Sequence, residues 1–225
     1  MANELVKIKG ISKRNGLTFT LGSLLLLGLV ILFSGIGALA KIPTYFLVVV
    51  SLAGVFIGIV KLKEPEYSLV LDKKGIRYLH ARGSWFVPWQ DIQRIDIPTV
   101  DQGLDKKHLP YVALRLKSQV RLLDTISLRL ASYLVTEQRE IAIAALKQDF
   151  DNWQCADGSC PSEVLYRFED YETEDKVYKG LRAMLGHRLE ILRDKLGYDV
   201  YIPASALDRE PNDFVGLLRR LQASV

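Results

Sequence analysis

The side chains that could act in catalysis are few and widely separated along this chain of 225 residues. Its three histidines, His80, His108 and His187, lie in unrelated local sequences, without a phosphate-binding glycine loop, a serine elbow or an H-E-x-x-H motif. General acid–base chemistry needs a base within hydrogen-bond reach of its partner, and the sequence identifies no such pair. We therefore name no catalytic residue and expect no enzymatic activity.

Metal-binding chemistry is also incomplete. Cys155 and Cys160 flank a short loop, CADGSCP, but a structural zinc site needs four ligands and His187 is the only histidine downstream. The alternatives for the cysteines are an incidental reduced pair or a redox-sensitive local disulfide. We expect no metal and no cofactor. Three aspartates lie close together without the spacing of a calcium-binding loop: Asp96, Asp101 and Asp105.

Two long apolar segments near the N-terminus are the dominant feature of the chain. Residues 17–40 and 42–60 contain no Asp, Glu, Lys, Arg or His, and only Lys41 separates them. A helix needs about 20 apolar residues to span a bilayer. A cleaved signal peptide is the alternative, but its apolar region is about 7–15 residues long. We therefore predict a transmembrane helical hairpin over residues 17–63, after a basic cytoplasmic segment at 1–16.

Basic residues flank the predicted hairpin on its outer ends, so the positive-inside rule places both termini in the cytoplasm. Residues 1–63 carry a net charge of +6, which leaves −2 for residues 64–225 because the whole chain carries +4. The later domain thus lacks the excess basic charge typical of nucleic-acid binding, and we expect no nucleic-acid partner. Membrane lipid is the expected partner of the flanking cations, which are Lys7, Lys9, Lys13, Arg14, Lys61 and Lys63.

Gly54 and Gly58 form a small-xxx-small pair in the second apolar segment. Such pairs allow two membrane helices to approach closely. We predict that they pack the hairpin, with a homodimer as the alternative use of the same motif.

The chain beyond the hairpin begins with alternating apolar and polar residues, which is the pattern of half-buried strands. Tight turns between these runs favour consecutive antiparallel strands. From residue 136 the period changes to that of an amphipathic helix, predicted over 136–153. The sequence therefore predicts an α+β domain. The expected strands are 66–72, 76–80, 84–89, 92–97, 111–117 and, within 120–130, one more.

Residues 69–97, LVLDKKGIRYLHARGSWFVPWQDIQRIDI, resemble the opening strands of bacterial pleckstrin-homology-like (PH-like) domains. The resemblance covers roughly residues 17–153 and implies a bent antiparallel sheet closed by a C-terminal helix, directly after a two-helix membrane hairpin. The whole arrangement is similar to an uncharacterised proteobacterial family of inner-membrane proteins. The residues that carry the motif are Asp72, Gly75, Ile76, Trp89, Asp91 and Ile92.

The motif residues also have a direct physical interpretation. Asp72 and Gly75 suit a turn with an Asx contact and a permissive φ. Trp89 can fill the core face of the sheet, and Asp91 can hydrogen-bond local backbone.

The remainder of the chain, residues 154–225, is predicted as an α/β extension. Within it, residues 176–195 form a basic segment with leucines on one helical face, which either pack on the sheet or leave the cations free to bind anionic lipid. The candidate lipid contacts are Lys61, Lys63, Lys176, Lys179, Arg182 and Arg188.

Two layouts of the C-terminal part stay open from the sequence. In the first, residues 198–221 repeat the strand–helix pattern of 125–146 as a second unit. In the second, the strand at 199–203 completes the preceding sheet and the last helix caps it, with 136–196 as a helical insertion.

Two classes of function follow from this organisation. The first is an inner-membrane binding or scaffolding module for a lipid or for a membrane or cytoplasmic protein, by analogy with PH-like folds. The second is a membrane-tethered enzyme, or a regulatory subunit of a transport or envelope-synthesis complex. An exposed apolar groove favours the first class, and a concave pocket with convergent polar side chains favours the second.

Overall fold

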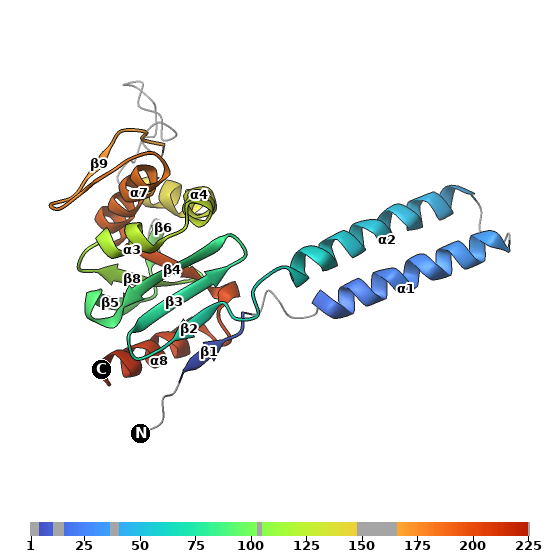
Figure 1. Cartoon of the computed structure of the whole chain (residues 1–225), viewed down its shortest axis with the longest axis horizontal. Helices are drawn as coiled ribbons and strands as arrows, with labels where there is room; N and C mark the ends of the chain where they lie inside the picture. The colour runs from blue at the N-terminus through green and yellow to red at the C-terminus, as the bar shows by residue number, and fades with distance from the viewer. Residues whose placement is uncertain (1–4, 11–15, 37–40, 103–104, 148–165, 225) are drawn as a thin grey trace.

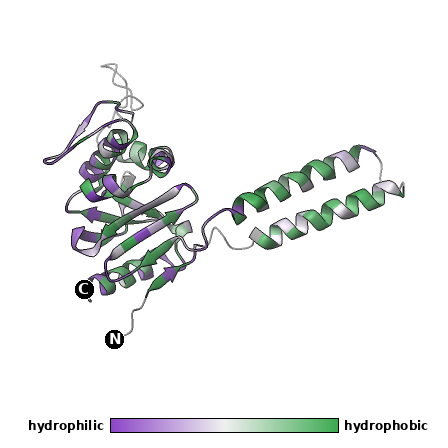
Figure 2. Cartoon of the chain, viewed as in Figure 1, coloured by the Kyte–Doolittle hydropathy of each residue, from purple (hydrophilic) through white to green (hydrophobic). Residues whose placement is uncertain are grey.

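The computed structural model describes residues 5–10, 16–36, 41–102, 105–147 and 166–224. It consists of a pair of long helices that project from an α+β domain (Figure 1). The helices are α1 (Gly16–Gly35) and α2 (Lys41–Leu62), and both are long and apolar enough to cross a membrane. Most of their residues are hydrophobic (Figure 2). The α+β class and the two apolar helices agree with the prediction.

The two long helices touch each other through small residues. A β-carbon at Gly54 would meet the side chain of Ser23, and one at Gly58 would lie 3.0 Å from the Cα of Thr20. Both glycines therefore lie at the contact between α1 and α2, where a larger side chain would separate the helices.

The first sheet joins a segment that precedes the two long helices in the sequence to segments that follow them. Its strand order is β1-β2-β3-β4, with β1 (Val6–Ile8) before α1 and β2 (Leu69–Leu71) after α2. These two strands pair antiparallel, with Val6 opposite Leu71 and Ile8 opposite Leu69. The long helices are thus an insertion within the sheet. Residues 6–8 were expected in a separate basic segment, and this was wrong because Ile8 is buried in the domain core.

The other strands of the first sheet follow the predicted order. β3 (Gly75–His80) and β4 (Gly83–Pro88) form the hairpin expected from the alternating pattern. A short 3-10 turn, η2 (Trp89–Asp91), then leads into the second sheet.

The second sheet has the order β11-β8-β5. β5 (Ile92–Asp96) and β8 (Tyr111–Leu116) pair antiparallel, and β11 (Val200–Pro203) pairs with the other edge of β8. Residues 101–110, for which the sequence predicts no strand, contribute to a separate hairpin of β6 (Thr99–Gln102) and β7 (Asp105–His108). Helix α8 (Pro211–Ala223) packs on β5 and β8. This arrangement corresponds to the second of the two layouts.

A mostly helical insertion lies between β8 and β11. The strand expected within 120–130 was wrong, because Ser127 accepts a hydrogen bond from the N–H of Leu130 and so caps a helix there. The single helix expected over 136–153 also differs, since one helix ends and another begins around Gln138. The insertion contains α3 (Val120–Thr125), α4 (Leu128–Glu137), α5 (Arg139–Lys147), β9 (Tyr171–Glu172), β10 (Val177–Tyr178) and α7 (Leu181–Leu196).

One apolar cluster unites both sheets with the insertion and α8. It includes Ile8 of β1, Trp85 of β4, Leu130 of α4 and Phe214 of α8. In Figure 1, α8 lies at one end of the sheets and α3, α4 and α7 lie at the other. The part before the hairpin, the sheets and the insertion therefore all contribute to this cluster.

Gly75 is needed for close packing and not for an unusual φ, which corrects the expectation of a permissive φ. Its φ is not positive, but a β-carbon would lie 2.6 Å from the Cα of Pro88 and would also strike the carbonyl oxygen of Val87. We expect Gly75→Ala to lower the free energy of unfolding by about 1–3 kcal/mol, as overpacking does. Chemical denaturation of the detergent-solubilised chain measures this change.

Gly216→Ala is the matched control, because a β-carbon there meets nothing within 4 Å. In the interior of α8 this change is expected to stabilise by about 0.5–1 kcal/mol. Equal effects of the two substitutions would contradict the packing account of Gly75.

Candidate functional site

A small cavity lies where the first sheet meets the two long helices. Its volume is about 140 Å³. Gly10, which precedes α1, and Glu64 and Pro65, which follow α2, form one wall. The rest comes from β3, the end of α4 and the 3-10 turn η3 (Ala204–Ala206). The β3–β4 turn next to it points toward the long helices (Figure 1). The polar side chains on which the site depends are Glu64, Tyr78, His80, Tyr133, Glu137 and Ser205.

A stack of rings runs from the core to this cavity. Trp85 lies on Tyr78 with 5.5 Å between centroids, and Tyr78 lies 6.3 Å from His80. His80 stacks on Tyr133 with 4.5 Å between ring centroids, and the guanidinium of Arg82 lies over the Tyr133 ring, 4.6 Å from its centroid. Tyr78 and His80 are two residues apart on β3, so they point to the same face of the strand. The stack fixes the rings through packing and a cation–π contact.

The hydrogen bonds and the pKa shifts of the stacked side chains define their protonation states. Tyr78 is 6 % exposed, and its hydroxyl group has no hydrogen-bond partner among the described residues. His80 accepts the backbone N–H of Arg82 at Nδ1, 3.2 Å away, so the neutral ring carries its proton on Nε2. Burial raises the pKa of Tyr78 and of Tyr133, and the Glu137 carboxylate raises both further. Both phenols therefore stay protonated at neutral pH.

His80 is expected to remain neutral below its ordinary titration range. Burial is the main cause that lowers its pKa, and the Arg82 guanidinium lowers it further, against smaller opposing effects of Glu64 and Glu137. A depressed histidine pKa means that the folded state binds fewer protons. This contribution to stability is therefore present above about pH 6.5 and is lost as the pH falls through the folded pKa.

An NMR titration of the ring measures the His80 pKa directly. We expect a value below about 6.5, the ordinary histidine value, with the signal assigned by its loss in His80→Gln. Arg82→Gln should raise this pKa by removing a like charge. An unshifted or raised pKa in the wild type would contradict the buried, neutral state of His80.

Comparison with family models gives one match. A family described as "Protein of unknown function (DUF2982)" covers residues 69–224. The chain belongs to this family. No curated protein and no solved structure matches it. The DUF2982 region begins at the first residue of β2 and ends just after α8, so Tyr78, His80, Tyr133 and Glu137 lie within it. Gly10 and Glu64, which complete the cavity, lie outside the matched region.

The predicted PH-like motif residues form a corner of the DUF2982 region, away from the cavity. Asp72 Oδ1 accepts the N–H groups of Lys74 and Gly75, at 2.7 and 2.8 Å, which is the expected Asx contact. Trp89 is buried, and its Nε1 donates to the carbonyl of Asp72 at 2.7 Å. Asp91 differs from the expectation, because its side chain pairs with Arg121 at 3.2 Å. These contacts hold the corner together.

Two of the candidate lipid contacts, Lys176 and Lys179, lie far from the long helices. They belong to the β9–β10 ribbon, on the opposite side of the domain from α1 and α2 (Figure 1). Lys176 pairs with Asp124 at 2.6 Å, and Lys179 pairs with Asp170 at 3.3 Å. Their predicted contact with the membrane does not fit this position. Lys61 in the last turn of α2 and Lys63 just beyond it do lie next to the predicted span.

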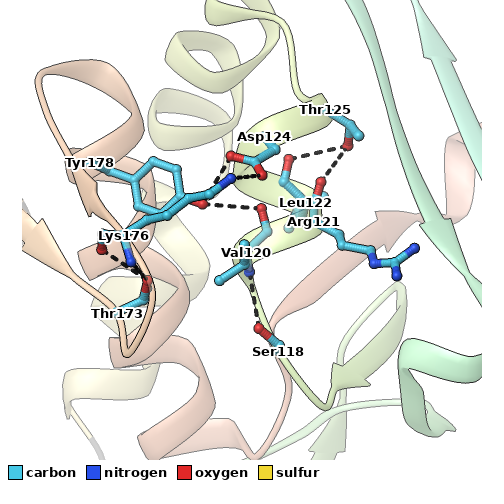
Figure 3. A network of polar contacts seen from close by, with 9 residues as sticks. All are labelled: Ser118, Val120, Arg121, Leu122, Asp124, Thr125, Thr173, Lys176 and Tyr178. Atoms are coloured by element: carbon cyan, nitrogen blue, oxygen red, sulfur yellow. Dashed lines mark hydrogen bonds and ion pairs between the residues drawn. The ribbon is translucent and has the colours of Figure 1, made fainter.

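The ribbon is fastened to α3 by the network in Figure 3. Tyr178 donates to Asp124 at 3.0 Å and lies 3.3 Å from the carbonyl of Val120. Burial, followed by the hydrogen bond to Asp124, raises the pKa of Tyr178 to about 12. Lys176 pairs with the same Asp124 carboxylate, so it stabilises the contact between the ribbon and α3.

Arg188 is the clearest correction among the candidate lipid contacts. Its side chain is buried at 0 % exposure, and its guanidinium donates to the carbonyl of Val135 at 3.2 Å. Arg182 is half-buried. The physical reason is that α7 packs against α4, α5 and β9 and is not a surface helix.

A buried carboxylate that the sequence analysis missed joins the insertion to the second sheet. Asp199 accepts hydrogen bonds from the N–H of Leu116, from Gln119 Nε2 and from Arg193 Nε, each at 2.7 Å. Tyr171 then donates to Gln119 at 2.7 Å. The signal available in the sequence was an acid at the start of the apolar run 200–202. The described residues contain no group of His, Cys, Asp or Glu that could hold a metal ion.

Proposed function

We propose that this protein is a two-span inner-membrane protein whose domain is a non-catalytic binding module with its ligand site at the membrane surface. The observation that carries the proposal is the composition of the cavity wall. Gly10 comes from before the hairpin, Glu64 from after it, and Tyr133 from the helical insertion. Such a site forms only where the anchor and the folded domain meet.

The placement of the domain in the cytoplasm rests on two arguments. The pairing of β1 with β2 across the hairpin supports a placement of both hairpin ends on the same side of the membrane. The cations on these ends, including Lys9 and Lys63, favour the cytoplasmic side. We expect a reporter fused after Val225 to be active in the cytoplasm of a bacterial cell. An active periplasmic reporter would overturn this orientation.

A PH-like architecture is the part of the proposal that concerns the fold. It is supported by two antiparallel sheets around one core and by α8, a C-terminal helix packed on the second sheet. A fold of this kind suggests binding by analogy only, so the function is argued from the cavity.

A membrane-tethered enzyme is the second candidate function. The observation that favours it is the convergence of His80 with Glu64 and Glu137 in one concave site. The size of the cavity favours the binding module, because small-molecule sites usually enclose about 300–1,000 Å³. A site of about 140 Å³ suits a single small chemical group.

Site-specific photocrosslinking in intact membranes tests the binding function. A photoreactive phenylalanine analogue replaces Ser205 at the cavity, and the control replaces Asn212 on α8, which is also exposed. We expect a reproducible lipid or protein adduct from position 205 that is absent at position 212. Equal yields at the two positions, or no adduct at position 205, would contradict a binding site at the cavity.

A further inference from the structure

We propose that the cavity binds the primary ammonium group of an aminophospholipid such as phosphatidylethanolamine. This inference rests on the proposed function and names the ligand of the same site. It is argued from the charge, the hydrogen-bonding groups and the position of the cavity.

The charged residues of the cavity wall favour a cation. Glu64 and Glu137 both line it, and both act electrostatically on Tyr78 and on His80, so the four groups converge. The wall contains no Lys or Arg among the described residues. Helix α2 ends at Leu62, two residues before Glu64, and the C-terminal end of a helix also attracts positive charge. An anionic group would meet repulsion from all three.

The hydroxyl group of Tyr78 points to a ligand that donates hydrogen bonds. The Tyr78 side chain is nine-tenths buried and lines the cavity. Its hydroxyl group makes no hydrogen bond to another described residue, so it is open to a polar ligand or to water in the cavity. An ammonium group has three donors and no acceptor. The phenol oxygen of Tyr78 and the carboxylate of Glu137 can accept two of these hydrogen bonds.

Hydrogen bonding distinguishes between amine headgroups. The primary ammonium of the ethanolamine headgroup carries three N–H donors. The quaternary ammonium of choline carries none, so it cannot donate to the oxygen atoms of Tyr78 and Glu137.

The position of the cavity points to a lipid as the source of the amine. Lys61 and Lys63 precede Glu64 by three residues and one residue, at the end of a helix long enough to span a membrane. If these lysines bind the phosphodiester of a lipid at the membrane surface, the amine attached to that phosphodiester lies next to the cavity. A protein partner's lysine could reach the same carboxylates, so the test must distinguish the two sources.

Native mass spectrometry of the full chain with bound lipid tests the ligand class. The protein is exchanged into micelles with equimolar phosphatidylethanolamine, phosphatidylglycerol and phosphatidylcholine of the same acyl chains. We expect selective retention of phosphatidylethanolamine. Glu137→Gln should lower that retention about tenfold, the effect of losing a hydrogen bond to a charged group, and leave phosphatidylglycerol unchanged.

Two further variants keep the test independent of folding. Tyr78→Phe should also lower retention of phosphatidylethanolamine, while Glu140→Gln, an exposed acid on α5, should not. Thermal unfolding midpoints verify that the variants remain folded. Retention without preference among the three lipids, or a preference that survives both Glu137→Gln and Tyr78→Phe, would overturn the proposal.

Carbodiimide coupling in intact membranes identifies the source of the amine. The reagent activates a carboxylate, and a neighbouring primary amine then forms an amide and releases the urea. We expect Glu137 to carry the mass of phosphatidylethanolamine. A peptide adduct would overturn the lipid proposal while retaining the proposed binding function. An absence of adducts both here and from position 205 would contradict the two together.

Discussion

Ile8→Asp is expected to lower the free energy of unfolding of the domain by at least about 3 kcal/mol, although the hairpin separates residue 8 from the rest of the sheet in sequence. Ile8 is 1 % exposed and belongs to the same core cluster as Leu69 and Phe214. Truncating a buried isoleucine costs about 2–5 kcal/mol, and an unpaired carboxylate in the same place adds a desolvation penalty. Chemical denaturation of the full chain in detergent, followed by tryptophan fluorescence, measures the loss.

Lys9→Ala is the control for this substitution. Lys9 is exposed, and its ion pair with Glu66 at 3.8 Å is also exposed. Such a pair contributes at most about 1 kcal/mol. If the two variants unfold alike, β1 is not part of the folded core and the account of the sheet fails.

Asp199→Ala is expected to be the second large loss, about 3–5 kcal/mol, because breaking a buried ion pair leaves its partner charge uncompensated. The side chain of Asp199 is 0 % exposed and receives two hydrogen bonds from Arg193, at 2.7 and 3.0 Å. Its loss also leaves the N–H of Leu116 and the amide of Gln119 without this acceptor. The same denaturation experiment measures it.

The surface pair of Asp208 and Arg209 supplies the comparison. These side chains are partly exposed and are 2.9 Å apart. Asp208→Ala should therefore change stability by less than about 1 kcal/mol. A small effect of Asp199→Ala, similar to that of Asp208→Ala, would show that the buried network does not hold the insertion to the sheet.

The strands of the first sheet could be predicted because local signals agree there. Alternating residues from Leu69 to Pro88 have one buried face, and Asp72 supplies the turn. The strand β1 has only three residues and stands next to a long apolar helix, so no periodicity identifies it. The run ISLRL at 126–130 alternates like a strand, but five residues are too few to distinguish the two periods.

The candidate site could not be assembled from the sequence for a different reason. The sequence presents His80 as an isolated histidine because its stacking partner, Tyr133, is 53 positions away. Tyr133 also lies on α4, and the first residues of this helix were expected to form a strand. Glu64 and Gly10 meet only because the sheet closes across the hairpin. Long-range pairing of this kind has no local signature. Lys61 and Lys63 were found because their role depends on sequence position alone.

Disulfide crosslinking between β1 and β2 tests the central claim, that the helical hairpin of α1 and α2 is inserted within one sheet. Lys7 lies opposite Val70, and Val70 lies opposite Arg77 on the next strand. The test combines Lys7→Cys with Val70→Cys in a chain whose two natural cysteines are replaced by serine. The control combines Lys7→Cys with Arg77→Cys, which lie two strand spacings apart, about 9.6 Å, beyond the reach of a disulfide.

After oxidation in isolated membranes, the account predicts a disulfide between positions 7 and 70 and none between positions 7 and 77. A protease cut in the loop between α1 and α2 would then leave the two fragments joined until reduction. Equal crosslinking of the two pairs, or no crosslink between positions 7 and 70, would contradict the inserted hairpin and, with it, the site built at its base.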